Sequence, residues 1–296
     1  MTPHQKGLMI TALGVLVIAP DALLLRFITL PAEQVVLWRG LLNMLGFFAI
    51  VVFRYRRHWV QAYLACTRVG IGCALLFTVS TFGFVLGNHF TKAGNVLVIL
   101  ASAPFIAALL SRFFLHERLA LRTGLAIAGS MVGISLIVID DLGSGSWLGS
   151  AFALLAALGL AGNLTLARSR PHIDMSPMLT LSGLFTATFA FIWIKFTGSA
   201  IALPDAVNAG WLLLLCALLL PIGFTLIQQG PQYIPSAEVS LLLLLETILG
   251  TLLVWWILSE RPSPLALLGG AIVVSVIFIK NGIEFLKTAP APLCKK

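Results

Sequence analysis

The sequence predicts an all-α polytopic membrane protein with ten transmembrane helices, arranged as two inverted repeats of five helices each. The chain has 296 residues, of which 59% are hydrophobic, and its mean hydropathy is +1.02. These values are typical of membrane proteins rather than of soluble domains. Several apolar stretches reach the roughly 20 residues that cross a bilayer core. The stretches are continuous rather than alternating, which indicates helices and not a β-barrel.

The predicted spans are separated by short connections that carry helix-breaking residues such as Pro31, Pro171 and Pro204. No connection is long enough to hold a soluble domain. The ten spans are residues 7–26, 32–53, 64–87, 93–114, 121–139, 147–167, 176–196, 209–229, 237–258 and 263–281.

Charge and cysteine usage limit the partners that we expect. The chain has 19 Lys and Arg against 11 Asp and Glu, but no basic run carries interleaved aromatic residues, so a nucleic-acid partner is not expected. About 14 of the 19 basic residues fall on one side if the N-terminus is cytoplasmic, which predicts that both termini are cytoplasmic. The four cysteines lack CxxC spacing, so neither a metal site nor a disulfide framework is indicated. No cofactor is expected.

A repeated motif divides the chain into two halves. The pair Glu117-Arg118 returns 143 positions later as Glu260-Arg261, each time after an apolar run. We therefore predict one repeat over residues 1–141 and a second over residues 142–296. Each repeat has five spans, an odd number, so the second repeat enters the membrane inverted, as in many secondary transporters. Glu117 and Glu260 are predicted to have a local structural role at their hairpins, beside the positive end of the next helix.

The two copies also carry a family resemblance. The first copy runs from Ala103-Pro104 through Glu117, and the second runs from Leu245-Glu246-Thr247 through Glu260. With the ten-span plan, these segments make the chain similar to the EamA family of the drug/metabolite transporter superfamily, although Thr247 stands where the family usually has Pro. The resemblance implies a cavity between spans 1–4 and 6–9, with spans 5 and 10 outside it. It also implies export of small metabolites, often amino acids or their derivatives, from a bacterial inner membrane.

The predicted function is therefore secondary active efflux of amino acids or related compounds by alternating access, with proton coupling left open. The expected partners are the lipid bilayer and a small-molecule metabolite, and the expected state is a monomer, with a dimer as the alternative. A membrane-embedded enzyme and a non-transporting scaffold are the rival functions. The sequence offers no catalytic motif for an enzyme. A zinc-binding HExxH motif, for example, would need His at position 120 after His116-Glu117, and the residue there is Ala120.

Glu246 is the first candidate for substrate binding or coupling, because it lies about nine residues into its span, near the bilayer midplane at roughly 1.5 Å per residue. Its repeat partner is the apolar Ala103, so the shared scaffold does not require a charge there. A low dielectric disfavours the carboxylate, which suits Glu246 to exchanging protons or to binding a substrate amine. The alternative is a Glu that locks spans together through hydrogen bonds.

Asp21 and Arg39 are the second candidates, because both are predicted at the same depth in neighbouring spans. An ion pair between them is the simplest way to bury both charges. The pair either holds spans 1 and 2 together as a static contact, or a substrate carboxylate competes with Asp21 for Arg39. Asn43 and Asn163 either face the cavity or bridge helices.

Two further predictions concern polar residues at span ends and prolines inside spans. Polar residues at span ends are expected to be solvated at the interface, and His89 is a remote candidate for a proton relay. The polar residues in question are Asn88, His89, Gln228, Gln229 and Gln232. Kinks are predicted at Pro20, Pro104 and Pro221, because proline removes a helical hydrogen bond.

Overall fold

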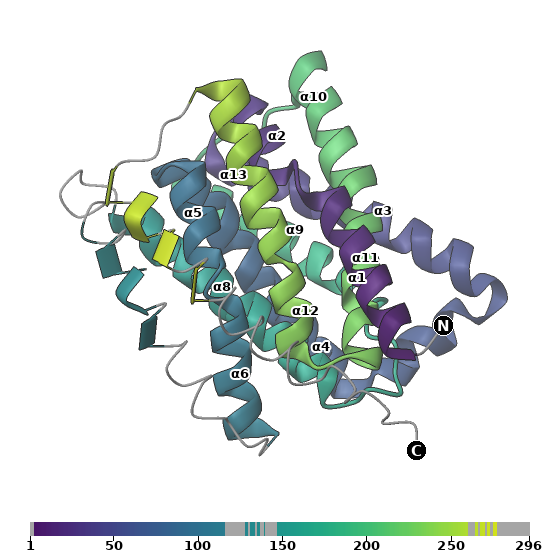
Figure 1. Cartoon of the computed structure of the whole chain (residues 1–296). Coiled ribbons are helices and arrows are strands. Elements are labelled where there is room, and N and C mark those ends of the chain that lie inside the picture. The colour runs from purple at the N-terminus through teal and green to yellow at the C-terminus, as the bar shows by residue number, and fades with distance from the viewer. Residues whose placement is uncertain are drawn as a thin grey trace, which may run out of the picture.

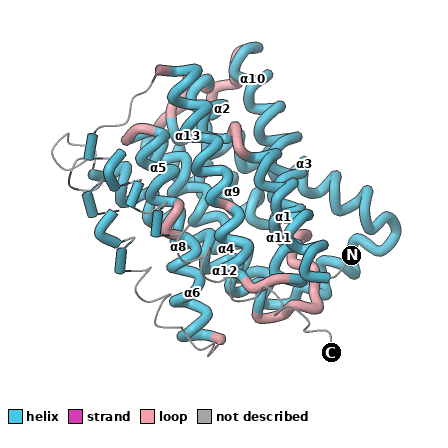
Figure 2. The backbone as a smooth tube through the Cα atoms, viewed as in Figure 1, coloured by secondary structure: helices cyan, strands magenta, loops and turns pink. Residues whose placement is uncertain are grey.

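The computed structural model describes residues 3–115 and 147–259, with scattered positions between 128 and 139 and between 264 and 276. Every element in this part of the chain is helical, and Figure 2 shows only helices and loops there. Seven stretches of the described residues are long and apolar enough to cross a membrane. The predicted spans 121–139 and 263–281 lie mostly outside the described residues, and the hairpin residues Glu117 and Glu260 lie wholly outside them.

The first half of the chain begins with six α-helices. They are α1 (Pro3–Ile18), α2 (Asp21–Phe27), α3 (Ala32–Tyr55), α4 (Trp59–Phe90), α5 (Ala93–Leu100) and α6 (Ala103–Phe114). One apolar stretch of 59 residues holds both α3 and α4. The chain reverses between them through a 3₁₀ turn at Arg56–His58, where Arg56 has a φ of 47° (Figure 1). This stretch therefore accounts for two of the predicted spans.

The second half repeats this plan. Its helices are α8 (Trp147–Arg168), α9 (Met178–Thr197), α10 (Ala206–Leu212), α11 (Leu220–Tyr233), α12 (Ser236–Leu242) and α13 (Leu244–Leu258). A π-helical stretch, Leu213–Leu219, joins α10 to α11 without a break. Pro221 lies two residues beyond the end of this stretch, and a proline that cannot donate to the preceding turn accounts for the wider winding there. At Pro221, where the sequence predicts a kink, the structure has a change of helix type.

Three of the predicted spans are broken into two helices each. Breaks lie at Ala19–Pro20 between α1 and α2, at Ala101–Ser102 between α5 and α6, and at Leu243 between α12 and α13. Pro20 lies in the first break, and Pro104 lies in the first turn after the second, as predicted. The break at Leu243 contains no proline. After each break a new helix begins inside the bundle. The N-terminal end of that helix carries a partial positive charge.

Helices of the two halves pack against each other. α1 packs on α11 and α8 packs on α4, so the first span of each half contacts the third span of the other (Figure 1). α3 packs along α9, and α5 packs on α13. This exchange of partners surrounds the middle of the molecule with helices from both halves.

The crossing of α3 and α9 depends on two glycines. A Cβ at Gly40 would lie 2.5 Å from the Ala187 nitrogen, and one at Gly183 would lie 2.6 Å from the Met44 nitrogen. Backbone meets backbone at this point, which only a glycine permits. Gly40 and Gly183 also correspond under the 143-residue offset, so the crossing lies where the two halves meet symmetrically.

Replacing Gly40 with Ala is expected to destabilise the protein by about 1–3 kcal/mol, because the new methyl group meets backbone that cannot move aside cheaply. The matched control is Gly210→Ala in α10, where nothing lies within 4 Å of an added Cβ. That variant should be neutral or stabilising by up to about 1 kcal/mol. The melting temperatures of the two purified variants provide the measurement. Equal stability of Gly40→Ala and Gly210→Ala would contradict the close backbone contact at Gly40.

Candidate functional site

An ion pair between Asp21 and Arg39 lies at the centre of the bundle. Arg39 donates from Nη1 to Asp21 Oδ1 at 2.8 Å and from Nη2 to Oδ2 at 2.7 Å. The two side chains are only 4% and 3% exposed. Two parallel charge-assisted bonds are a strong and directional arrangement. The predicted pairing is therefore confirmed, whereas its role in substrate binding stays a prediction.

A small cavity of about 20 Å³ adjoins this ion pair. It brings together four of the candidate residues, Asp21, Arg39, Asn43 and Glu246, from α2, α3 and α13. The hydroxyl-bearing Ser80 and Thr81 of α4 line it as well. The volume is close to what one water molecule needs, so this conformation is closed around the site.

Several polar groups at this cavity lack a partner. Glu246 is 3% exposed, and no described residue donates a hydrogen bond to its carboxylate or pairs with it. The Nε of Arg39 and the Oδ1 of Asn43 are also buried without a hydrogen-bond partner. Buried polar groups in folded proteins are nearly always satisfied, so these exceptions need an explanation. A polar ligand, a water or a proton that enters the cavity provides one.

The charges at the site do not balance when Glu246 is ionised. Asp21 and Arg39 neutralise each other, which leaves the Glu246 carboxylate as the excess charge. Glu246 lies in the first turn of α13, where the positive end of the helix favours an anion. Burial opposes that anion. A bound proton or a substrate ammonium group would remove the imbalance.

Aromatic rings form the apolar wall of the cavity. Phe77 of α4 and Phe224 of α11 meet edge to face, with ring centroids 4.8 Å apart. The Arg39 guanidinium lies over the Phe84 ring at 5.5 Å from its centroid. The sequence did not predict these rings as part of the site, although Phe77, Thr81 and Phe84 follow the four- and three-residue spacing of one helix face.

Asn163 does not lie among the described residues that line the cavity. It forms a reciprocal amide pair with Gln228: its Nδ2 donates to Gln228 Oε1 at 2.9 Å, and Gln228 Nε2 donates back to Asn163 Oδ1 at 3.2 Å. The pair joins α8 to α11 and is buried. Bridging of helices, the alternative left open by the sequence, is the arrangement observed.

Replacing Asn163 with Ala is expected to cost about 1–3 kcal/mol of stability, because Gln228 would be left buried with unsatisfied polar atoms. The double variant Asn163→Leu/Gln228→Leu removes both partners and should recover most of this loss. Unfolding of the single and double variants in detergent provides the measurement. A double variant less stable than Asn163→Ala would contradict a simple amide bridge between the two side chains.

Interfacial solvation is the wrong interpretation for three of the polar residues at span ends. Asn88, Gln228 and Gln229 are only 2%, 3% and 8% exposed. The helix α4 continues to Phe90 and α11 continues to Tyr233, so these residues lie within helices that pack on α8 and α1 rather than at helix ends. His89, in contrast, is exposed.

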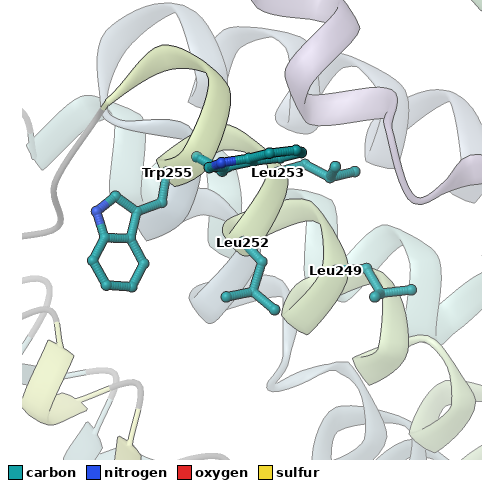
Figure 3. A pocket seen from close by; sticks show the side chains of 5 residues that line it. Leu249, Leu252, Leu253 and Trp255 are labelled. Carbon is teal, nitrogen blue, oxygen red and sulfur yellow. The ribbon is translucent and has the colours of Figure 1, made fainter.

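A separate hollow on α13 does not have the chemistry of a metabolite site. It has a volume of about 550 Å³ and is lined by apolar and tryptophan side chains. Figure 3 shows Leu249, Leu252, Leu253 and Trp255 around it on one helix. None of the described residues that line it is charged, so the polar cavity remains the candidate site.

The apolar helices and the buried polar site define a multi-pass membrane protein with an internal cavity of the kind found in transporters. The chain belongs to the EamA-like transporter family, whose family model matches it twice, over residues 5–139 and 147–281.

Two individual proteins resemble this chain. A probable terminal-alkyne amino-acid exporter from Streptantibioticus cattleyicolor is 29% identical over 209 residues, which are 66% of this chain and 66% of the relative. A protein of known crystal structure, whose name states no function, superposes with a TM-score of 0.68 at 16% identity and covers 95% of this chain and 99% of its own. The structural likeness supports the fold alone.

Proposed function

We propose that this protein is a secondary active exporter of amino acids or related zwitterionic compounds in a bacterial inner membrane. The proposal rests on the closed cavity and its polar groups of opposite character. These are the unpaired Arg39 Nε donor, the unpaired Asn43 Oδ1 acceptor and the buried Glu246 carboxylate, to which no described residue donates a hydrogen bond. The name of the Streptantibioticus relative, which refers to an amino-acid exporter, supports the same substrate class.

Each group at the cavity then has a role toward a zwitterion. Glu246 and the Oδ1 of Asn43 accept hydrogen bonds from the substrate ammonium group. Arg39 keeps its two bonds to Asp21 and offers Nε to the substrate carboxylate. The substrate side chain packs against Phe77, Phe84 or Phe224. When no substrate is bound, a proton on Glu246 removes the unpaired charge, and this exchange couples export to the proton gradient.

Alternating access supplies the mechanism. The first span of each half packs on the third span of the other, as expected for two inverted repeats related by an axis through the α3–α9 crossing. Exchange of conformation between the repeats would expose the central cavity to one side and then to the other. In this proposal the fold comprises ten spans, with both termini cytoplasmic, and the monomer contains the whole pathway.

Counterflow in liposomes tests the proposal. Purified protein is reconstituted into vesicles loaded with one unlabelled amino acid at a time, and uptake of the same labelled compound is followed with and without a pH gradient. We expect accumulation for at least one apolar or aromatic amino acid, and a change of its rate with the gradient. Uptake equal to that of protein-free vesicles for every amino acid would refute the proposed substrate class.

A further inference from the structure

A second cavity lies between α2, α3 and α4. Its volume is about 120 Å³, several times that of the cavity at the ion pair. Arg26, Asn88 and His89 are its polar lining residues. The remaining lining is apolar and comprises Leu25, Ile28, Leu30, Ala32, Val35 and Val85.

The same three helices line both cavities, at successive positions along each helix. On α2, Asp21 lines the cavity at the ion pair and Leu25 lines the second one. On α3, the second cavity is lined by Val35 and the first by Arg39, one turn further on. On α4, the last residue of the first cavity is Phe84, and Val85 is the next residue in the second. The second cavity therefore follows the first along the bundle, toward the end where α2 and α4 terminate.

Phe84 lines the first cavity at the point of α4 where the lining of the second begins, with Val85 next in the chain and Asn88 one turn further on. The Arg39 guanidinium lies over its ring at 5.5 Å from the centroid. Asn88 donates from Nδ2 to the Phe84 carbonyl oxygen at 2.9 Å. This bond fixes the orientation of the Asn88 amide, because only the nitrogen of the amide can donate to a carbonyl oxygen.

The fixed amide leaves one polar atom without a partner. Asn88 is 2% exposed, and its Oδ1 has no hydrogen-bond partner. This acceptor belongs to a side chain that lines the second cavity, as does the positively charged Arg26. Arg26 is itself held by a hydrogen bond of 2.8 Å from Nη2 to the Thr91 carbonyl oxygen. The described lining of the second cavity thus includes a cation, Arg26, and a hydrogen-bond acceptor, Asn88 Oδ1.

We propose that this second cavity is a vestibule in which the zwitterionic substrate binds transiently, and that the Phe84 side chain is the gate between the vestibule and the site. The proposal rests on the proposed function for the identity of the substrate. In the vestibule the substrate carboxylate faces Arg26 and its ammonium group faces Asn88 Oδ1. A substrate carboxylate that engages Arg39 in the site competes for the guanidinium that holds the Phe84 ring, which links occupancy of the site to opening of the gate.

Cysteine accessibility tests the gate without the need for a transported substrate. Ser80→Cys, in a chain whose four native cysteines are replaced by Ala, places a thiol in the first cavity. A membrane-impermeant maleimide is applied to each face of sealed vesicles in turn. His89→Cys, at the mouth of the vestibule, identifies the face on which the vestibule opens. Phe84→Ala is then combined with Ser80→Cys, and only variants that elute as a single species on gel filtration are compared.

We expect Phe84→Ala to raise the labelling rate of Ser80→Cys by at least about tenfold from the face that labels His89→Cys, because loss of the ring leaves a gap larger than a water molecule. The milder Phe84→Leu should give a smaller rise. Phe77→Ala is the matched control, because it removes the same kind of ring from the same cavity about two turns of α4 further from Val85 and Asn88, which line the vestibule. No rise with either Phe84 variant, or an equal rise with Phe77→Ala, would overturn the gate. Neither result depends on counterflow, so failure of the gate is distinguishable from failure of the proposed substrate class.

Discussion

Replacing Glu246 with Gln is expected to abolish the dependence of export on the pH gradient and to slow transport by about tenfold or more, which corresponds to about 1.4 kcal/mol. Gln is close to Glu in shape but can neither take up a proton nor carry the charge that attracts a substrate ammonium group. The protein should still fold, because no described residue relies on the Glu246 carboxylate as a hydrogen-bond partner. Counterflow at several pH values measures both effects.

Glu238→Gln is the matched control for this substitution. Glu238 belongs to α12, the helix before α13, and its Oε2 lies 2.9 Å from Nε2 of the partly exposed His4. It lies outside the described lining of the cavity, so we expect normal transport and pH dependence. A Glu246→Gln variant that transports at the wild-type rate, with unchanged pH dependence, would exclude Glu246 from coupling and from substrate binding.

Replacing Arg39 with Met is expected to destabilise the protein by about 3–5 kcal/mol, because Asp21 would be left as a buried and uncompensated charge. Asp21→Asn should cost less, since the neutral amide still accepts a hydrogen bond while Arg39 loses its counter-charge. The yield of monodisperse protein and its melting temperature in detergent measure these losses.

Exchange of the two charges separates structure from binding. Asp21→Arg combined with Arg39→Asp restores the opposite charges and should recover much of the stability lost in the single variants. Transport should stay low, because the Nε donor and the cation over Phe84 no longer come from position 39. Full recovery of transport would mean that the pair serves only to hold α2 and α3 together.

Sequence alone predicted the features that depend on local composition or on the cost of burying a charge. Hydropathy located the eight spans that the described residues cover, because twenty apolar residues have few alternatives to a membrane helix. The Asp21–Arg39 pair was predictable since each charge needs a partner at its own depth.

Features that depend on tertiary packing were not predictable in this way. The break at Leu243 has no proline to indicate it, yet this break places Glu246 in the first turn of α13. Asn163 occupies the position equivalent to Asp21, but it pairs with Gln228. The residues next to Asn163 and Gln228 in the sequence do not indicate this contact between α8 and α11. The aromatic wall follows a helical period, but aromatic residues at that period are equally typical of an ordinary core.

Binding of the exported amino acid in the cavity at Asp21, Arg39 and Glu246 is tested most directly by ligand-induced stabilisation of the purified protein. An amino acid that gives counterflow should raise the melting temperature of the wild type and of Glu238→Gln with increasing concentration. At 100 times Kd the stabilisation is about 2.7 kcal/mol. The same amino acid should give little or no shift with Glu246→Gln. A shift of equal size in all three proteins would place the binding site elsewhere and contradict the account.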